Sequence, residues 1–202
     1  TANWTGTSSC ANSYSLTLRN VEDFENASTL FTISGGTYLT GANTGGSPST
    51  ASLSSTGSYG YGVINGAAIL TSTAFKTSSL VSPSLSFNLS GLSYGTTTNG
   101  VDVGDSVKVE ISPDNGATWY NTLYVNSSIS NGFWAFTAAG SATTAYDGDN
   151  TPVVFSGNGS SNGIATVTVT GLPTVAALRV RITMRNNSAN EAWIIDNFRL
   201  SS

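Results

Sequence analysis

The sequence predicts an all-β fold, an antiparallel jelly-roll β-sandwich, and three observations support this prediction. Apolar and polar side chains alternate in short runs, most clearly where Val107, Val109 and Ile111 recur at every second position. β-Branched and aromatic residues, which suit a pleated and half-buried surface, fill these runs, while Gly, Asn and Ser separate them. No segment shows the apolar spacing that a long helix requires.

Each expected strand is a short apolar or alternating run bounded by turn residues. In chain order these runs cover residues 14–18, 22–25, 30–33, 63–64, 85–89, 106–112, 119–125, 164–169, 178–184 and 193–198. Residues 31–60 and 138–163 are rich in Thr, Gly, Ser and Asn, so we expect mostly loops there. We expect one domain over residues 1–202, with residues 1–13 as an N-terminal extension.

Particular side chains justify the strands of the first half. Leu16 and Leu18 alternate with polar residues in the first run, and Leu85, Phe87 and Leu89 do the same in the fifth. Between these runs, a turn of alternating glycine and tyrosine leads into the short run that begins at Val63, which predicts a change of direction before that strand.

Two turns position the strands of the second half. Residues 112–119 match the Asp-box pattern S-x-D-x-G-x-T-W, in which Asp114 accepts backbone N–H groups, Gly116 takes a positive φ and Trp119 packs beneath the hairpin. A sialidase-like propeller would need several copies of this pattern at regular spacing, so the single copy predicts a structural hairpin. Residues 171–173 join the next two strands.

The composition excludes several classes of function. The formal net charge is −4 and no basic stripe is present, so nucleic acid and anionic membranes are poor partners. No apolar run reaches the roughly 20 residues that span a bilayer. The chain has no histidine and only one cysteine, Cys10, which excludes His-dependent triads, His-ligated zinc and an internal disulfide. We therefore expect no enzyme and assign no catalytic residue.

The terminal run places a carboxylate among apolar side chains. Strict alternation puts Ile194, Asp196, Phe198 and Leu200 on one face of this strand. An ionised carboxylate that faces a core is costly unless a cation or hydrogen-bond donors compensate it. The sequence therefore predicts a partner for Asp196.

A second acidic cluster lies near the start of the chain, at Glu22, Asp23 and Glu25. A hard divalent cation held by Asp196 and by these acids would compensate the buried charge through oxygen ligands, which calcium prefers. The alternative is an ion pair with an arginine, for which Arg179, Arg185 and Arg199 are available. Both alternatives stay open from the residues alone.

Four motifs follow one another along the chain: the acidic run at residues 22–25, L-V-S-P-S-L at 80–85, the run G-D through T-W at 104–119, and an arginine-rich strand followed by W-I-I-D-N-F. Their order resembles a jelly-roll module common in secreted proteins of Bacteroidetes, similar in pattern to the MAM-type β-sandwich. The last two elements occupy residues 179–182 and 193–198, so the resemblance spans about residues 20–200. The disulfides of MAM domains are absent.

This resemblance implies a structural Ca²⁺ between the first and last strands. Asp23, Glu25 and Asp196 match the acidic positions of the module, and Asn197 stands where a second Asp is often found, which removes one negative charge. The resemblance also implies an accessory module of a larger, multidomain exported protein, located outside the cell or on the bacterial cell surface.

Aromatic residues in polar loops are the candidate ligand contacts. They share a setting of glycine, asparagine and other polar residues, and they are Tyr59, Tyr61, Tyr94, Trp134 and Tyr146. Aromatic faces stack on sugar rings, and polar loop groups bind hydroxyls. The alternative is ordinary packing in the core and rim of a β-sandwich.

Two further acidic turns, residues 102–105 and 147–150, resemble fragments of calcium loops because oxygen-bearing side chains alternate beside glycine. Neither has the spacing of an EF-hand, and the alternative interpretation is a solvated acidic turn.

The function predicted from these observations is a non-catalytic extracellular module that binds carbohydrate or mediates adhesion, with a polysaccharide or cell-surface glycan as partner. The alternative is a structural or protein-interaction spacer of a larger exported protein, and a glycan-active enzyme is the third and weakest candidate. These candidates differ in whether the aromatic residues are exposed or packed.

Overall fold

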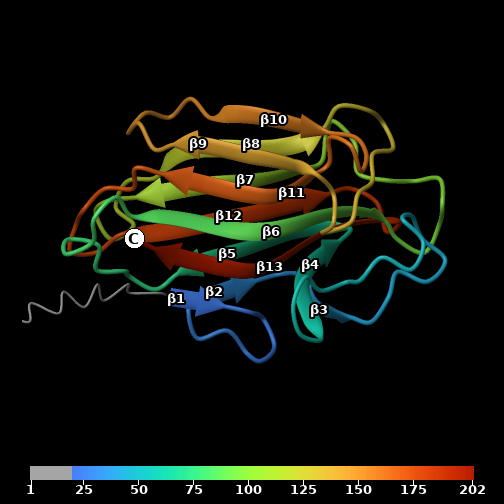
Figure 1. The fold of residues 1–202 in the computed structure, drawn as a ribbon, viewed down its shortest axis with the longest axis horizontal. Coiled ribbons are helices and arrows are strands. Elements are labelled where there is room, and N and C mark those ends of the chain that lie inside the picture. Colours follow the sequence, from blue (N-terminus) through green and yellow to red (C-terminus); the bar gives the residue numbers. More distant parts are fainter. Residues whose placement is uncertain (1–19) are drawn as a thin grey trace, which may run out of the picture.

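The structure is a computed structural model that describes residues 20–202, and this part of the chain folds into two β-sheets packed face to face (Figure 1). The first sheet has the strand order β3-β4-β13-β6-β11-β9, with β1 also paired to β13. Its strands are β1 (Asn20–Glu22), β3 (Thr37–Thr40), β4 (Tyr59–Ile64), β6 (Ser84–Ser93), β9 (Gly140–Ala145), β11 (Ile164–Thr170) and β13 (Glu191–Ser201).

The second sheet has the order β10-β8-β7-β12-β5-β2. Its strands are β2 (Phe31–Ser34), β5 (Gly66–Ser72), β7 (Ser106–Ser112), β8 (Tyr120–Ser127), β10 (Val153–Gly157) and β12 (Arg179–Asn186). Every pairing is antiparallel except at one edge of each sheet, where β9 lies parallel to β11 and β10 lies parallel to β8. The prediction of an all-β jelly-roll sandwich is confirmed, and β7 has the bounds that alternation predicts.

The main core lies between the sheets and is built from alternate residues of each strand. In β7 the side chains of Val107, Val109 and Ile111 are fully buried, and Trp193 and Ile195 of β13 join the same cluster. A smaller apolar cluster covers the other face of the first sheet; its fully or mostly buried members are Leu39, Leu53, Leu92, Ala192 and Ile194. The strand predicted over residues 14–18 lies outside the described residues, as do Cys10 and residues 1–13.

The terminal strand β13 corrects the prediction of strict alternation. Its register shifts at a β-bulge between Asp196 and Arg199, where Asn197 has φ of 55°. An extra residue in one strand moves the following side chains to the opposite face. Asp196 therefore does not share the core-facing side with Phe198.

The clusters confirm this change of face. Ile194 packs in the smaller cluster outside the first sheet, whereas Phe198 and Leu200 pack in the main core. Asp196 has the same parity as Ile194 and no intervening bulge, so its carboxylate emerges on the outer face, where it is nevertheless fully buried.

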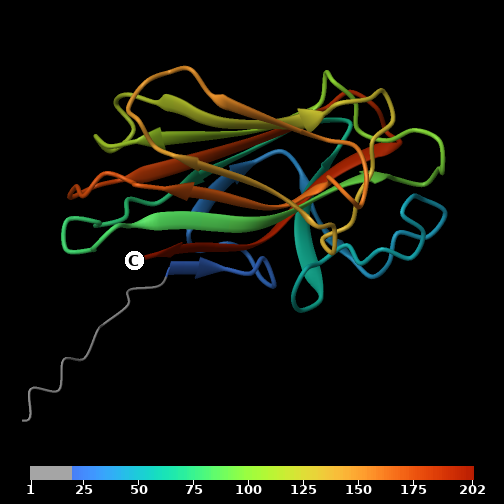
Figure 2. The ribbon, with the colours of Figure 1, turned by 45° about the horizontal axis from the view of Figure 1, so that its top comes forward.

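The bulge coincides with a gap along one side of β13. Strand β4 pairs with residues 192–195, and β1 pairs with residues 198–200. Figures 1 and 2 show β1 beside β13 close to the C-terminus. The first described strand is thus hydrogen-bonded to the last. Among the described residues no helix has the length and apolarity needed to cross a membrane.

Candidate functional site

Backbone N–H groups donate hydrogen bonds to the buried carboxylate of Asp196. Its Oδ2 accepts hydrogen bonds from the N–H groups of Ser55 and Thr56 at 2.7 and 2.8 Å, and its Oδ1 accepts one from Asn197 at 2.6 Å. Burial raises the pKa of Asp196, the bonds from Thr56, Ser55 and Asn197 lower it, and the charge of Glu25 raises it, with a net upward direction. The donors therefore offset only part of the cost of burying this charge.

Glu25 binds the residues that follow Ser55 and Thr56 in the chain. Its Oε1 accepts hydrogen bonds from the backbone N–H groups of Ser58 and Tyr59 at 2.8 and 2.9 Å. The N–H groups of Ser55, Thr56, Ser58 and Tyr59, which lead into β4, therefore donate to two carboxylates. Glu25 lies in the segment after β1, and Asp196 lies at the bulge in β13.

The other three residues predicted at this site form hydrogen bonds with residues close in sequence. Glu22 Oε1 accepts the N–H of Phe24 at 3.1 Å, and its Oε2 accepts the hydroxyl of Ser28. Asp23 is exposed and accepts the N–H of Glu25 at 3.3 Å. Asn197 forms the bulge and accepts a hydrogen bond from Arg199 Nε at 3.0 Å.

The acids predicted between the first and last strands do not form a group of three carboxylates within the described residues whose oxygens lie within 4.8 Å of one another. A calcium ion at this place therefore stays a prediction. The arginine alternative does not apply, because the described residues form ion pairs only at Glu110, with Lys108 and Arg181. The partners that the described residues offer to Asp196 are the backbone N–H groups of Ser55, Thr56 and Asn197.

The structure separates the five aromatic residues predicted to contact a ligand. Trp134 is fully buried and donates from its ring nitrogen to the carbonyl of Ile164, so the predicted ligand contact is corrected to core packing. Tyr61 is also buried, with its hydroxyl bonded to Gly35, and the same correction applies. Tyr94 and Tyr146 are half-buried and pack against the small and main clusters.

Tyr59 is the predicted aromatic residue that lines a groove, of about 260 Å³. The other walls are Tyr38, Glu25, Asn26 and Ala27. The rings of Tyr38 and Tyr59 are 36% and 38% exposed, and they meet edge to face with 6.5 Å between their centroids. This groove is the candidate ligand site.

The sequence interpretation missed Tyr38, and one signal could have identified it. Tyr38 follows the Gly35-Gly36 pair in a polar segment, which resembles the glycine-flanked setting of Tyr59. Its pairing with Tyr61 across β3 and β4 depends on a strand register that the sequence leaves open.

A larger hollow of about 580 Å³ lies on the other side of the same segment, between residues 48–57 and residues 135–137. Hydroxyl-bearing side chains dominate its walls, and Phe136 is its one aromatic residue. It lacks the pair of exposed rings found in the Tyr38–Tyr59 groove, so we do not assign a ligand to it.

The Asp-box hairpin has the structural role predicted for it. Asp114 Oδ1 accepts the hydroxyl of Ser112 and the N–H of Thr118 at 2.7 and 2.8 Å. Gly116 has φ of 93°, a conformation that glycine tolerates best. The motif serves to fix the turn between β7 and β8.

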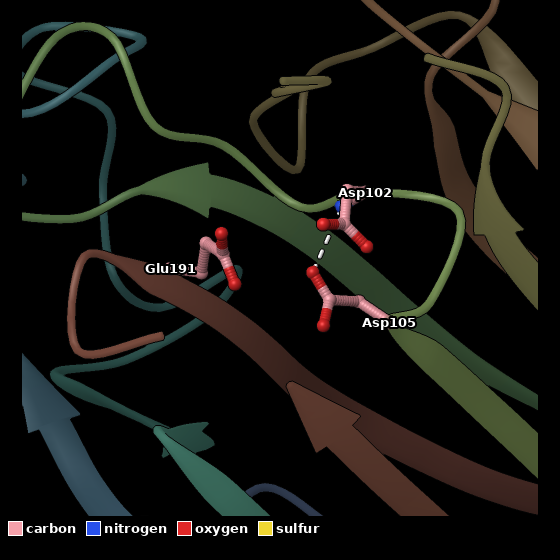
Figure 3. Close-up of side chains that lie close together, drawn as sticks. All are labelled: Asp102, Asp105 and Glu191. Atoms are coloured by element: carbon pink, nitrogen blue, oxygen red, sulfur yellow. Dashed lines mark hydrogen bonds between the residues drawn. The ribbon is translucent and has the colours of Figure 1, made fainter. Parts of the chain in front are cut away.

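A second acidic cluster, the acidic triad of Asp102, Asp105 and Glu191, joins the two sheets (Figure 3). Asp102 and Asp105 lie in the turn before β7 of the second sheet, whereas Glu191 opens β13 of the first. One carboxylate oxygen from each residue lies within 4.8 Å of the other two. This spacing could hold a metal ion. The solvated turn predicted as an alternative for residues 102–105 is corrected, because Asp105 is fully buried.

Hydrogen bonds within the turn orient this triad but leave oxygen atoms free. Asp105 Oδ2 accepts the N–H of Asp102 at 2.8 Å, and Asp102 Oδ1 accepts the N–H of Gly104 at 2.7 Å. Asp105 Oδ1 and Glu191 Oε2 are buried without a hydrogen-bond partner.

Burial and like charge shift the pKa values of the triad. Burial raises the pKa of Asp105. Burial, followed by the charge of Asp105, raises the pKa of Glu191 to about 7. These carboxylates are therefore unfavourable as isolated anions, which calls for a proton or a cation between them.

Comparisons with known proteins show the fold. No protein-family model matches the chain, and no curated protein matches it. Among solved structures it is similar to the K2 cleaved adhesin domain of Lys-gingipain, with 13% identity, a TM-score of 0.50, and coverage of 91% of this chain and 98% of that one. A second similar structure is TmCBM61 in complex with β-1,4-galactotriose, with 11% identity, a TM-score of 0.41, and coverage of 90% and 86%. The chain is a β-sandwich module of the architecture found in the adhesin domain.

Proposed function

We propose that this chain is a non-catalytic binding module that recognises carbohydrate in the Tyr38–Tyr59 groove. The observation that carries the proposal is the combination of two partly exposed tyrosine rings with the carboxylate of Glu25 and the amide of Asn26. Aromatic rings offer flat apolar surfaces that match the C–H faces of sugars, and a few placed polar groups orient hydroxyls. Both kinds of contact are present in one groove.

The groove has polar atoms available for a ligand. Glu25 uses Oε1 to accept two backbone N–H groups, and within the described part of the chain its Oε2 has no donor. The hydroxyl of Tyr59 likewise has no hydrogen-bond partner among these residues, while Asn26 is exposed. A sugar hydroxyl could donate to Glu25 while its ring packs on Tyr59.

The second ring of the groove is held in place before a ligand arrives. The hydroxyl of Tyr38 donates to the carbonyl of Asn26 at 2.9 Å and accepts the N–H of Ser28 at 3.2 Å. Its ring also meets Tyr61 edge to face at 5.0 Å. Preorganised side chains reduce the entropy that is lost on binding.

The acids of the structure support a non-catalytic role. Asp105 and Glu191 are a facing pair of carboxyl groups, the arrangement that glycoside hydrolysis uses. They are 0% and 5% exposed, however, so a polysaccharide cannot reach them. The remaining carboxylate pair, Glu25 and Asp196, is engaged by backbone N–H groups.

The setting that we propose is extracellular, as one module of a larger exported protein. The acidic, lysine-poor and Ser/Thr/Gly/Asn-rich composition supports this setting, as does the resemblance of the motif order to secreted modules. The adhesin domain of Lys-gingipain shares only the fold, so the proposed ligand depends on the groove.

The test is affinity electrophoresis of the whole chain against plant, algal and microbial polysaccharides. We expect one class of polysaccharide to retard the protein, Tyr59→Ala to abolish the retardation, and Tyr124→Ala to leave it unchanged. Tyr124 is a matched control, because it is a half-buried strand tyrosine of the other sheet.

Two results would contradict the proposal. Retardation that survives Tyr59→Ala would move the site elsewhere, and the 580 Å³ hollow would be the next candidate. No retardation by any polysaccharide would favour a protein-interaction module instead. The edge strand β10 would then be the first surface to examine, because Val153 and Val154 are 42% and 57% exposed on it.

A further inference from the structure

We infer that Asp102, Asp105 and Glu191 bind a divalent cation, calcium, and that this ion links the two sheets at one end of the sandwich. The site is remote in sequence from the Tyr38–Tyr59 groove and shares no residue with it, so the inference stands independently of carbohydrate binding. It also differs from the calcium position implied by the resemblance, which uses the first and last strands.

The first observation is the convergence of three carboxylates from two sheets. Their ligand oxygens lie within 4.8 Å of one another, and Figure 3 shows Asp105 and Glu191 facing each other from separate elements. Calcium binds oxygen at about 2.3–2.6 Å, so two oxygens that share one ion lie at most about 4.6–5.2 Å apart. A separation within 4.8 Å is therefore compatible with one shared calcium ion.

The second observation is independent of this spacing. Asp105 Oδ1 and Glu191 Oε2 are buried and accept no hydrogen bond, and their residues are 0% and 5% exposed. Buried polar atoms in folded proteins nearly always have partners, and an unpaired buried charge is costly. Both atoms belong to carboxylates of the acidic triad, so two of its three residues carry a buried oxygen without a partner.

No positively charged side chain supplies this partner. The two ion pairs formed by the described residues both belong to Glu110. Arg185, which flanks β7 across from Ser106, is exposed on the outer face of β12. Because residues 20–202 supply no such charge, a mobile cation is one partner for these carboxylates, and the alternative is a proton shared by Asp105 and Glu191.

The role of Asp102 distinguishes these two possibilities. A shared proton needs only Asp105 and Glu191, whereas the structure brings a third carboxylate to the same point and fixes it by a hydrogen bond from Gly104. Three hard oxygen donors of high charge are the set that calcium selects. Asp102 is also half-buried rather than enclosed, and it gives the ion a path from solvent.

Binding at this place would have a structural consequence. Asp105 directly precedes β7 in one sheet, and Glu191 is the first residue of β13 in the other. An ion held by both would connect the sheets where their hydrogen-bond networks do not reach each other. Because an unfolded chain lacks the site, binding free energy would add to folding stability.

The experiment is calcium titration of the whole chain by calorimetry, together with thermal unfolding in calcium and in chelator. We expect one ion per chain and a higher Tm with calcium. Glu191→Gln should weaken calcium binding at least about tenfold, because it removes a charged ligand. In chelator the same variant should be no less stable than the wild type, because it also removes like-charge repulsion.

Two control variants locate the ion. The double variant Asp147→Asn with Asp149→Asn alters an exposed acidic turn of similar sequence and should leave calcium affinity unchanged. Asp196→Asn should leave it unchanged as well. If Glu191→Gln does not fold, Asp102→Asn replaces it, because Asp102 is half-buried and should still lower calcium affinity.

Each contrary result overturns the inference. Absence of calcium binding to the wild type at millimolar concentration would assign a shared proton to Asp105 and Glu191. Binding that is lost in Asp196→Asn and kept in Glu191→Gln would place the ion between the first and last strands. Failure of the carbohydrate experiment leaves this result unaffected, because the two sites share no residue.

Discussion

The carboxylate of Asp196 accepts a hydrogen bond from the backbone N–H of Ser55 at 2.7 Å, and it joins residues 141 positions apart in the chain. With the hydrogen bonds from Thr56 and Asn197, this contact attaches the irregular segment before β4 to the bulge of β13. β4 pairs with β13 up to residue 195 and β1 pairs with it from residue 198. The side chain of Asp196 thus supplies hydrogen bonds in the interval where neither strand pairs with β13.

Removal of this acceptor should destabilise the fold. Asp196→Ala leaves the N–H groups of Ser55 and Thr56 without their acceptor, and we expect a loss of about 2–4 kcal/mol in the free energy of unfolding. Asp196→Asn keeps one acceptor oxygen and should lose less. Urea unfolding in chelator measures both variants, and an Ala variant within 0.5 kcal/mol or so of the wild type would contradict this role.

The bulge at Asn197 predicts that glycine at this position destabilises the fold less than valine does. Its φ of 55° is accessible to glycine and asparagine but costly for a β-branched residue. Asn197→Gly should change the free energy of unfolding by less than about 1 kcal/mol, whereas Asn197→Val should cost about 1–3 kcal/mol more. Denaturant midpoints of the two variants provide the comparison, and equal midpoints would show that the left-handed conformation is not retained.

The ion-pair cluster around Glu110 predicts a dependence on pH. Arg181 donates two hydrogen bonds to this carboxylate at 2.7 and 2.8 Å, Lys108 lies 3.1 Å away, and Arg181 also stacks over Trp119 at 4.2 Å. Burial raises the pKa of Glu110, but the hydrogen bonds and charges of Arg181 and Lys108 lower it by more, so the net pKa lies below 4.5.

A carboxyl group whose pKa is lower in the folded state stabilises the fold above its unfolded pKa and loses this effect as pH falls through the folded value. Glu110→Gln should therefore cost about 1–3 kcal/mol at pH 7. The difference from the wild type should shrink below the usual pKa of 4.5 and disappear once the folded carboxyl is protonated. Urea unfolding at a series of pH values measures the difference in free energy of unfolding between the two proteins. A difference that does not depend on pH would show that lost packing, and not lost charge, destabilises the variant.

The Asp-box hairpin offers a matched pair of glycines. Gly116 has φ of 93°, whereas Gly159 has open space around its Cβ position and no positive φ. Gly116→Ala should cost about 1–2 kcal/mol through backbone strain, and Gly159→Ala should be close to neutral. Thermal unfolding of the two variants tests the difference, and a neutral Gly116→Ala would mean that the turn can adopt another conformation.

Local periodicity was sufficient to predict the fold class and several strands. Alternating valines gave the bounds of β7, and the Asp-box residues predicted the following turn, because both depend only on neighbours in sequence. The face of Asp196 could not be predicted in this way. It depends on the bulge at Asn197, and no apolar pattern marks where an extra residue enters a strand.

Residues 102–105 were interpreted as resembling a fragment of a calcium loop, but their convergence with Glu191 could not be predicted. Asp105 has the parity of Val107, and Glu191 has the parity of Trp193, so alternation directs both carboxylates between the sheets. Their encounter depends on which ends of β7 and β13 lie together, and this follows from the order of strands in two sheets. Sequence periodicity gives the direction of a side chain but not its distant neighbour.

The pairing of β1 with β13 bears on how the module would respond to mechanical load. Asn20 lies opposite Leu200, so the two strands run antiparallel and the start of β1 lies beside the end of β13. A force that separates these ends would load the hydrogen bonds of the pair one after another, as in a zipper, rather than together in shear. The first rupture would release β1, while Glu25 and Asp196 would still hold the segment before β4.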